Sequence, residues 1–479
     1  MIHKPILIKD LSLSFPYKTC FEDFNCQIPY KSRIAIIGRN GSGKSTLLKI
    51  IANYFEPSNG SVIHTPDMVM GYVPQVIEDH LKLSGGQRVN KTITNALSAH
   101  PNVLLLDEPT NHLDSLNRKR LMGMIKNYPG TLIVVSHDTD LLRYYVDTIW
   151  HIADGNIQVF SGNYDDYIHQ IKLKRTSIEK QLNSLSRQKK YMHHKLLQEQ
   201  TRAAKSKARG EKKVENRQWL KMVGNLKGMK AEKSQGKKLK AIDTTKDHLT
   251  DKLSSLRLPE VIVPKFSIKS SDARGQTLIQ ISDGSVGYLP DQPLLSRINL
   301  SISDNEYVAI IGENGSGKST LIKAILEDES IYKTGNWSII KQDAIGYLDQ
   351  DYNTLNPEKS VLEILLEVAP DWPHAKIRIH LNNFLFRKNE EVNALVKNLS
   401  GGEKARLSLA KIAAKTPKML ILDEMTNNLD LETKTHVIQV LKAYPGAMII
   451  ISHDTDFLKE IDVKRYLKIR TDFIQVKPC

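Results

Sequence analysis

Two lysines stand in the same local pattern, and that pattern suits the binding of phosphate groups. Residues 38–45 read GRNGSGKS and residues 312–319 read GENGSGKS, so both fit G-x-x-x-x-G-K-[ST]. The glycines let backbone N–H groups cradle phosphate oxygens at the start of a helix. The lysines would neutralise the β- and γ-phosphates, and the serines after them would hold Mg²⁺. The predicted contact residues are Gly38, Asn40, Gly41, Gly43, Lys44, Ser45 and Thr46 in the first loop and Gly312, Asn314, Gly315, Gly317, Lys318, Ser319 and Thr320 in the second.

Paired carboxylates follow an apolar run downstream of each loop. Asp107 and Glu108 end the run LLLDE, and Asp423 and Glu424 end the run LILDE. Such runs are typical of buried parallel strands, and ligands gather at the carboxyl ends of these strands. We expect the aspartates to assist Mg²⁺ and the glutamates to act as general bases toward the attacking water, an effect of about 10²–10⁴-fold. An exposed acidic pair at a strand end is the structural alternative.

Further polar residues recur at matching positions in the two halves. His137 and His453, in VSHD and ISHD, follow the two aspartates at the same interval, and we expect them to contact the γ-phosphate. A purely structural histidine is the alternative. Gln75 and Gln350 follow the two lysines at intervals that differ by a single position, and they would reach Mg²⁺ or water. The aromatic residues placed to stack on adenine, with core packing as the alternative, are Phe15 and Tyr288.

The intervals between these motifs agree closely in the two halves at every step but one. Each half carries an L-S-G-G segment, whose serine precedes the aspartate by the same interval in both halves. Gln75 precedes Ser84 by 9 residues, whereas Gln350 precedes Ser400 by 50 residues. The first half therefore lacks about 41 residues (50 − 9) at one defined place.

Two α/β units would position these motifs, over residues 1–165 and 275–479. Each opens with a strand, continues through its phosphate loop into a helix, and later contains buried strands. More than half of the chain separates Lys44 from Lys318, which indicates a tandem domain duplication rather than a solenoid. The expected buried strands are residues 103–106, 132–135, 419–422 and 448–451.

All of the net positive charge lies between the two units. The chain carries +15 overall, and residues 172–252 contain 24 Lys/Arg against 8 Asp/Glu, an excess of +16. The remainder is close to neutral, with 44 basic (68 − 24) and 45 acidic (53 − 8) residues. Basic blocks of this kind mark polyanionic partners.

The same segment has apolar residues at heptad spacing. They form two series separated by a stretch that contains Gly210 and three more glycines. This predicts a basic antiparallel helical hairpin over residues 166–260, with a first helix of about 35 to 40 residues. A charged, partly disordered linker is the alternative. The seam residues are Ile171, Ile178, Leu182, Leu185 and Met192 in the first series and Leu239, Ile242, Leu249, Leu253 and Leu256 in the second.

Composition argues against several other classes of protein. The chain is 40% apolar and 25% charged, as expected of a soluble globular protein. It has no run of about 18 uncharged apolar residues, and its first residues do not resemble a signal peptide. Cys20, Cys26 and Cys479 are too few and too irregular for a disulfide framework or a zinc site. We expect free thiols and a cytoplasmic location.

The order of the motifs resembles that of the ATP-binding cassette superfamily. Phosphate loop, glutamine, L-S-G-G, D-E and S-H-D follow one another twice. The resemblance implies ATP as the nucleotide and head-to-tail packing of the two cassettes. Each L-S-G-G segment would close on the ATP held by the other cassette, so ATP would join the halves and hydrolysis would release them. The closing residues would be Ser400, Gly401 and Gly402 for the Lys44 site and Ser84, Gly85 and Gly86 for the Lys318 site.

Two tandem cassettes joined by a basic hairpin resemble the ABC-F subfamily. That resemblance implies a monomer with intramolecular cassette dimerisation, which binds the ribosomal E site and directs its hairpin tip toward the peptidyl-transferase centre. The partners would be rRNA and P-site tRNA. Residues 109–114 read PTNHLD, the usual motif of that group, whereas residues 425–430 read MTNNLD. Met425 in place of proline would relax the backbone beside Glu424, so we expect a second site that is active but unequal.

Two other classes of function are alternatives to a ribosome-binding ATPase. A transporter ATPase receives its membrane subunit on the helical region before L-S-G-G, and only residues 76–83 are present there in the first half. DNA-repair and chromosome ATPases also pair two cassettes and use basic hairpins, but those hairpins usually run much longer. Both alternatives therefore fit this chain less well.

Within the ABC-F subfamily two roles remain open. The short first half resembles ribosome-protection proteins that dislodge antibiotics acting on the large subunit, and we favour that hypothesis. Housekeeping translation factors on initiating or stalled ribosomes often carry an extra arm in the first cassette, for which this chain has no room. The hairpin tip would lie around residues 209–240, where packing within the hairpin is the alternative to reaching outward. The candidate tip side chains are Trp219, Leu220, Met222 and Met229.

Overall fold

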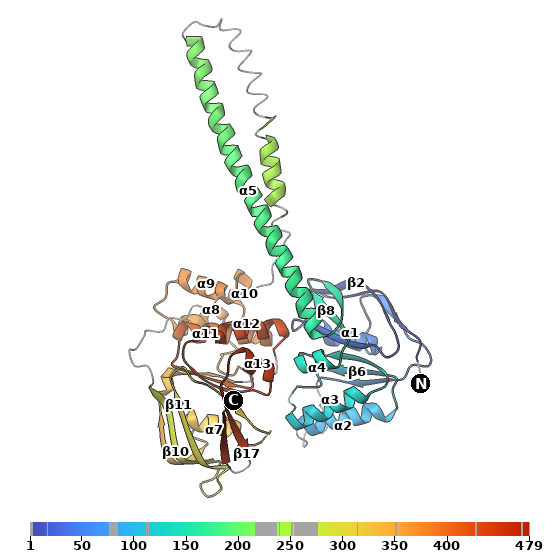
Figure 1. Cartoon of the computed structure of the whole chain (residues 1–479), viewed down its shortest axis with the longest axis vertical. Coiled ribbons are helices and arrows are strands. Elements are labelled where there is room, and N and C mark those ends of the chain that lie inside the picture. The colour runs from blue at the N-terminus through green and yellow to red at the C-terminus, as the bar shows by residue number, and fades with distance from the viewer. Residues whose placement is uncertain are drawn as a thin grey trace. The chain divides into compact units, whose positions relative to one another are not determined.

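A computed structural model describes the chain except at residues 1–2, 17, 76–84, 112, 114, 216–236, 239, 251, 253–275, 314, 350–351, 427–428, 471–472 and 479 (Figure 1). The fold is mixed α/β with two tandem cassettes, as the sequence predicts. The chain divides into two compact units, one comprising Met1–Tyr167 with Val261–Cys479 and the other Ile168–Glu260. The first unit holds both cassettes, so the three-domain division at 165 and 275 stays a prediction.

The first cassette is built from a small antiparallel sheet and a larger, mainly parallel one. The strand orders are β2-β1-β4 and β5-β6-β7-β3-β8-β9, and only β9 runs antiparallel in the larger sheet. Every residue of β6 and β7 is buried, which is why these strands read as continuous apolar runs. The strands are β1 Ile6–Phe15, β2 Lys18–Ile28, β3 Arg33–Gly38, β4 Asn59–Ile63, β5 Met70–Val73, β6 Val103–Asp107, β7 Thr131–Val135, β8 Thr148–Ala153 and β9 Asn156–Ser161, and the helices are α1 Lys44–Ile51, α2 Gly85–Ser98, α3 Ser115–Asn127 and α4 Thr139–Tyr144.

The second cassette repeats this architecture. Its strand orders are β11-β10-β13 and β14-β15-β16-β12-β17-β18, which correspond position by position to those of the first cassette. The strands are β10 Thr277–Gly287, β11 Leu295–Ser303, β12 Tyr307–Ile311, β13 Tyr332–Ile339, β14 Ile345–Leu348, β15 Met419–Asp423, β16 Ala447–Ile451, β17 Arg465–Arg470 and β18 Phe473–Pro478. The helices are α7 Lys318–Ile325, α8 Val361–Val368, α9 His374–Asn383, α10 Asn389–Asn393, α11 Gly401–Lys415, α12 Leu431–Lys442 and α13 Thr455–Glu460, with short 3₁₀ helices η1 Gln342–Ala344 and η2 Val396–Asn398.

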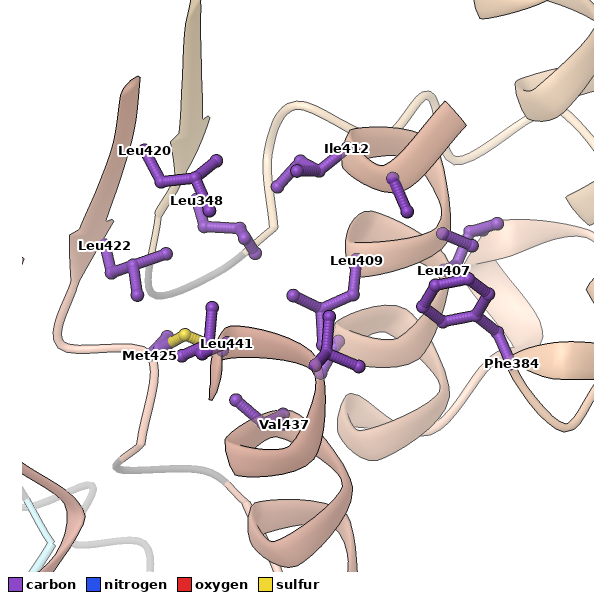
Figure 2. Close-up of a cluster of buried hydrophobic side chains, with 14 of the residues drawn as sticks. Leu348, Phe384, Leu407, Leu409, Ile412, Leu420, Leu422, Met425, Val437 and Leu441 are labelled. Atoms are coloured by element: carbon purple, nitrogen blue, oxygen red, sulfur yellow. The ribbon is translucent and has the colours of Figure 1, made fainter. Parts of the chain in front are cut away.

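The residues that the first cassette lacks form a helical subdomain in the second. Helices α8, α9 and α10 lie between β14 and α11 in the chain, and their apolar faces share one core with α11, α12 and β15. Figure 2 shows part of this core, in which Phe384 and Leu407 are fully buried. In the first cassette only residues 76–84 separate the end of the described chain after β5 from α2, and they lie outside the described residues.

The segment between the cassettes begins with one long helix, α5 Tyr164–Glu215. At 52 residues it exceeds the expected 35 to 40, so that expectation is wrong. Gly210 lies inside this helix rather than ending it, because a single glycine costs only about 1 kcal/mol relative to alanine. Residues 237–252 are helical wherever they are described and belong to the same compact unit.

The heptad residues of this unit are less exposed than their neighbours. The seam residues of α5 are partly buried, whereas the positions between them are mostly exposed. Leu249 is 8% exposed and Ile242 is partly buried. This pattern is what an apolar seam between two helices produces. The remaining seam residues Leu239, Leu253 and Leu256 and the predicted tip residues Trp219, Leu220, Met222 and Met229 lie outside the described residues.

Two general features complete the fold. Among the described residues, no helix is both long and apolar enough to cross a membrane. Cys20 and Cys26 are free thiols whose pKa values are raised by burial, and Cys479 lies outside the described part of the chain.

Candidate functional site

The first phosphate loop joins the end of β3 to the start of α1 and folds around its own lysine. Lys44 Nζ donates hydrogen bonds to the carbonyl oxygens of Gly38 at 2.9 Å and Arg39 at 3.1 Å. Burial lowers the pKa of Lys44. Gly43 has a φ of 96°, and a Cβ there would lie 3.1 Å from both Cys20 and Leu13. Only glycine fits this position comfortably, because side chains disfavour a left-handed backbone.

The second loop, between β12 and α7, has the same construction. Lys318 Nζ donates to the carbonyl oxygens of Gly312 and Glu313, at 2.9 Å each. Gly317, which precedes α7, has a φ of 94°. Gly41 and Gly315 also have positive φ values, of 74° and 78°. The loop residue Asn314 lies outside the described part of the chain. Thr46 and Thr320 lie in the first turns of α1 and α7, where Thr46 is partly buried and Thr320 is buried.

Each loop also holds a buried hydroxyl without a hydrogen-bond partner. These are the side chains of Ser42 and Ser316, one residue before Gly43 and Gly317. A buried polar group without a partner is costly, so its presence in both loops suits a ligand that brings acceptor oxygens. A polyphosphate meets that requirement, and the backbone N–H groups at the starts of α1 and α7 favour an anion.

The serine and aspartate predicted to hold Mg²⁺ lie together in both halves. Ser45 Oγ donates to Asp107 Oδ1 at 3.0 Å, and Ser319 hydrogen-bonds Asp423. Burial raises the pKa of each aspartate. A serine hydroxyl and an aspartate carboxylate supply only a few oxygen ligands. They therefore fit an ion such as Mg²⁺, which takes its remaining ligands from water and phosphate. Gln75 follows β5 with an exposed side chain, and Gln350 lies outside the described residues.

Glu108 and His137 form a buried pair beside the first loop. His137 Nε2 lies 3.2 Å from Glu108 Oε1, and the Glu108 side chain is only 6% exposed. Burial raises the pKa of Glu108 to about 7 and lowers that of His137 to about 3. The pair therefore combines a neutral imidazole with a carboxyl group that exchanges its proton near neutral pH, which suits a general base.

Glu108 has a left-handed backbone with a φ of 48°, and Glu424 matches it at 47°. Their backbone N–H groups donate to Val135 and Ile451 at 2.8 and 3.0 Å, which holds each glutamate at the end of the neighbouring strand. This conformation is unfavourable for a residue with a side chain, and here it recurs at the same position in both cassettes. The two φ values agree although Met425 replaces proline, so Glu424 itself keeps the backbone conformation of Glu108. The expected relaxation beside Glu424 stays a prediction.

The two glutamates differ in burial instead. The Glu424 side chain is 21% exposed, compared with 6% for Glu108, and its Oε1 lies 3.6 Å from His453 Nε2. The second glutamate–histidine pair is therefore looser and more accessible to water than the first.

The L-S-G-G segment of the second cassette starts helix α11. Ser400 Oγ accepts a hydrogen bond from the Glu403 backbone, and the Glu403 carboxylate accepts from the Ser400 backbone, so the two form a capping box. Gly401 and Gly402 are the first residues of α11, and a Cβ on Gly402 would lie 2.7 Å from the Thr433 hydroxyl. In the first cassette Gly85 and Gly86 begin α2, and Ser84 lies outside the described residues.

The two aromatic residues predicted to stack on adenine are exposed. Phe15 is 44% exposed at the end of β1, and Tyr288 is 53% exposed just after β10. The Tyr288 hydroxyl lies 3.3 Å from Thr320 Oγ1, which places this ring beside the second loop. Exposure of this size argues against the core-packing alternative for either residue.

Residues of the second cassette contact the first phosphate loop. Asp430 Oδ2 accepts a hydrogen bond from the Asn40 backbone N–H at 3.0 Å. Two residues later, Glu432 accepts two hydrogen bonds from the Arg39 guanidinium, at 2.6 and 2.5 Å. The first loop therefore contacts residues of both cassettes.

The sequence is similar to those of several known proteins. A family model described as "ABC transporter" matches residues 21–76 and 295–427. The putative ATP-binding protein YdiF of Bacillus subtilis is 28% identical over 98% of this chain and 80% of that protein. The erythromycin resistance ATP-binding protein MsrA of Staphylococcus epidermidis is 30% identical over 97% of this chain and 95% of that protein. The chain belongs to the ABC-F subfamily of ATP-binding cassette proteins. The ribosome protection protein VmlR of Bacillus subtilis is 27% identical over 95% of this chain and 85% of that protein.

Several residues of this ABC-F protein that shape the site were missed by sequence reasoning. Arg118 of α3 donates to Asp138 and Asp140 at 2.6 Å, and Lys434 of α12 pairs with Asp454. In both cassettes a cation thus holds the aspartate that follows the site histidine. Each histidine is followed by its aspartate at the same spacing in both halves, and each cation follows its D-E pair at the same spacing. These repeated spacings could have indicated the two ion pairs. Contacts such as Arg39–Glu432 left no local signal, because the residues are 393 positions apart.

Proposed function

We propose that this ABC-F protein is a Mg²⁺-dependent ATPase in which each phosphate loop holds one ATP. Lys44 and Lys318 would bind the β- and γ-phosphates, with the unpartnered Ser42 and Ser316 hydroxyls as further donors. Phe15 and Tyr288 would stack on the adenines. The observation that carries this proposal is the buried Glu108–His137 pair. A strand end with only a structural role gains nothing from burying a carboxyl group beside an imidazole.

In the proposed reaction the glutamates polarise water and the histidines orient the γ-phosphate. Glu108 and Glu424 would accept the proton of the attacking water, while His137 and His453 would donate a hydrogen bond to the phosphate oxygens. Mg²⁺, when bound, would neutralise the charge that develops on the phosphates. Ser45, Asp107 and Gln75 would hold it in the first site and Ser319, Asp423 and Gln350 in the second.

We further propose that each ATP is closed over by the other cassette. Ser400, Gly401 and Gly402 would complete the Lys44 site, and Ser84, Gly85 and Gly86 would complete the Lys318 site. The contacts of Asp430 and Glu432 with the first loop support this pairing. The chain would then act as a monomer whose cassettes close on ATP and part after hydrolysis.

The ribosome is the proposed partner, and the E site the proposed place of binding. The support is the excess of +16 between residues 172 and 252, which suits the phosphates of rRNA and P-site tRNA. One similar protein is named for ribosome protection and another for erythromycin resistance. We therefore favour protection of cytoplasmic ribosomes against large-subunit antibiotics. A housekeeping role on initiating or stalled ribosomes is the second candidate.

Two experiments test these proposals. The Glu108→Gln/Glu424→Gln variant should co-sediment with ribosomes at low salt in the presence of ATP, and the complex should dissociate as salt rises. The unsubstituted chain without nucleotide is the control, and failure of the variant to co-sediment would refute ribosome binding. Expression in a sensitive bacterium, with inhibitory concentrations measured for a panel of large-subunit antibiotics, separates the two roles. No shift for any drug would favour the housekeeping factor.

A further inference from the structure

The contact between Arg39 and Glu432 has the geometry of a bidentate ion pair. Arg39 Nε donates to Glu432 Oε2 at 2.6 Å and Nη2 donates to Oε1 at 2.5 Å, so both ends of the carboxylate are used. Bidentate pairs of this type are the most directional that arginine makes. The neighbouring Asn40–Asp430 hydrogen bond ties the same two segments together. Between residues that the structure describes, at least three hydrogen bonds thus join the first phosphate loop to the start of α12.

The equivalent pair cannot form at the other loop. Aligned on the phosphate-loop pattern, Arg39 corresponds to Glu313. Aligned on Asp114 and Asp430, which close PTNHLD and MTNNLD, Glu432 corresponds to Leu116. A glutamate and a leucine cannot form an ion pair, whatever the distance between them. This asymmetry follows from the residue types alone and does not depend on how far the cassettes are closed.

We propose that Arg39 and Glu432 form a one-sided latch between the cassettes, which makes the Lys44 site release its nucleotide more slowly than the Lys318 site. The latch rests on the proposed function, because it presumes that both loops hold ATP and that the cassettes close over it. Arg39 and Glu432 are positioning residues in this proposal. They hold the second cassette against the first phosphate loop and do not touch the reacting phosphate.

Solvent limits the strength of the latch. The Arg39 and Glu432 side chains are 58% and 37% exposed, so the pair ranks with surface ion pairs despite its good geometry. Loss of such a pair costs up to about 1 kcal/mol, which corresponds to about a fivefold faster opening. Reversal of one charge adds repulsion, since the neighbouring Asp430 already makes this surface acidic. We therefore expect an effect of about fivefold to tenfold for Arg39→Glu.

Release of a fluorescent ATP analogue measures the latch directly. The full chain carrying Glu108→Gln and Glu424→Gln is loaded with N-methylanthraniloyl-ATP and Mg²⁺ and then chased with unlabelled ATP. The proposal predicts two phases of equal amplitude. Arg39→Glu and Glu432→Arg should each accelerate only the slow phase, by about fivefold to tenfold. The double exchange Arg39→Glu/Glu432→Arg should return it to within about twofold of the parent, because the pair is rebuilt with its charges reversed.

Matched variants at the other loop provide the control and the converse test. Glu313→Ala, at the position equivalent to Arg39, should leave the slow phase unchanged. Glu313→Arg combined with Leu116→Glu should install the pair at the Lys318 site and slow the fast phase.

Two outcomes would overturn the latch: single reversals that leave the slow phase unchanged, or an exchanged pair that releases as fast as the single reversals. These outcomes are independent of the ribosome. A chain that shows the predicted phases and rescue but never co-sediments with ribosomes would refute the proposed partner and leave the latch standing.

Discussion

The buried carboxyl group of Glu108 should make the protein less stable as pH rises through the neutral range. Its pKa is raised from 4.5 to about 7 by burial, so the unfolded chain loses this proton near pH 4.5 while the folded chain keeps it until about pH 7. The stability contributed by the neutral form is therefore complete below pH 4.5 and is lost between these two values. The full loss is about 3.4 kcal/mol for a shift of this size, and about 2.5 kcal/mol of it falls between pH 5 and pH 8.

Glu108→Gln removes this titration and keeps the size of the side chain. The variant should gain stability over the parent on going from pH 5 to pH 8, by about 2.5 kcal/mol or roughly 5–10 °C in the melting temperature of a cassette. Scanning calorimetry of nucleotide-free protein at both pH values measures the difference, in which pH-independent effects of glutamine cancel. Glu424→Gln is the matched control for the substitution itself, because Glu424 has the same backbone but a side chain that is 21% rather than 6% exposed. An equal benefit of Glu108→Gln at both pH values would refute the reasoning.

Three further predictions concern activity and packing. With ATP turnover confined to the first site by Lys318→Ala, kcat/KM should rise with pH to a plateau with a midpoint near 7, since only ionised Glu108 accepts a proton; a flat profile from about pH 5.5 to 8.5 would contradict this role. Phe384→Ala should destabilise the second cassette by about 3–5 kcal/mol in calorimetry, whereas Ile379→Ala, at a position 63% exposed, should cost less than about 1 kcal/mol; equal costs would contradict the packing in Figure 2. Arg143 of α4 ion-pairs with both α5 and α13, so Arg143→Ala should cost about 1–2 kcal/mol and Arg143→Lys about half of that, and a neutral alanine variant would show that these pairs do not stabilise the fold.

Sequence reasoning succeeded where a pattern is local and repeated. The two lysines lie at strand-to-helix junctions, and each D-E pair lies at the end of a buried strand. In these segments the residues of the pattern itself determine the backbone conformation. Sequence reasoning failed on the length of α5, which continues through Gly210, because one glycine is tolerated inside a long helix.

Features created by tertiary structure left no local pattern. The left-handed backbone of Glu108 arises from a hydrogen bond to the neighbouring strand, since glutamate has no preference for that conformation. The Arg39–Glu432 pair depends on a contact between cassettes far apart in the chain. Neither feature can be predicted from one segment of the sequence alone. The opposite charges of Arg39 and Glu432 are present in the sequence, but only the structure shows that the two residues meet.

Three differences between the two sites make the Lys44 site the more tightly built one. The Lys44 site has the more buried glutamate, the closer histidine and the arginine latch. In the proposed head-to-tail pairing it is also the site closed by Ser400, which begins α11 beside the complete helical subdomain. The Lys318 site would be closed by Ser84, in the cassette that lacks about 41 residues (50 − 9). In that pairing the shortened segment would belong to the site with the looser glutamate, so the chain would combine one tightly built site with one that opens more readily. An order of events follows, because the site with fewer closing contacts should release its nucleotide first while the latch still joins the cassettes.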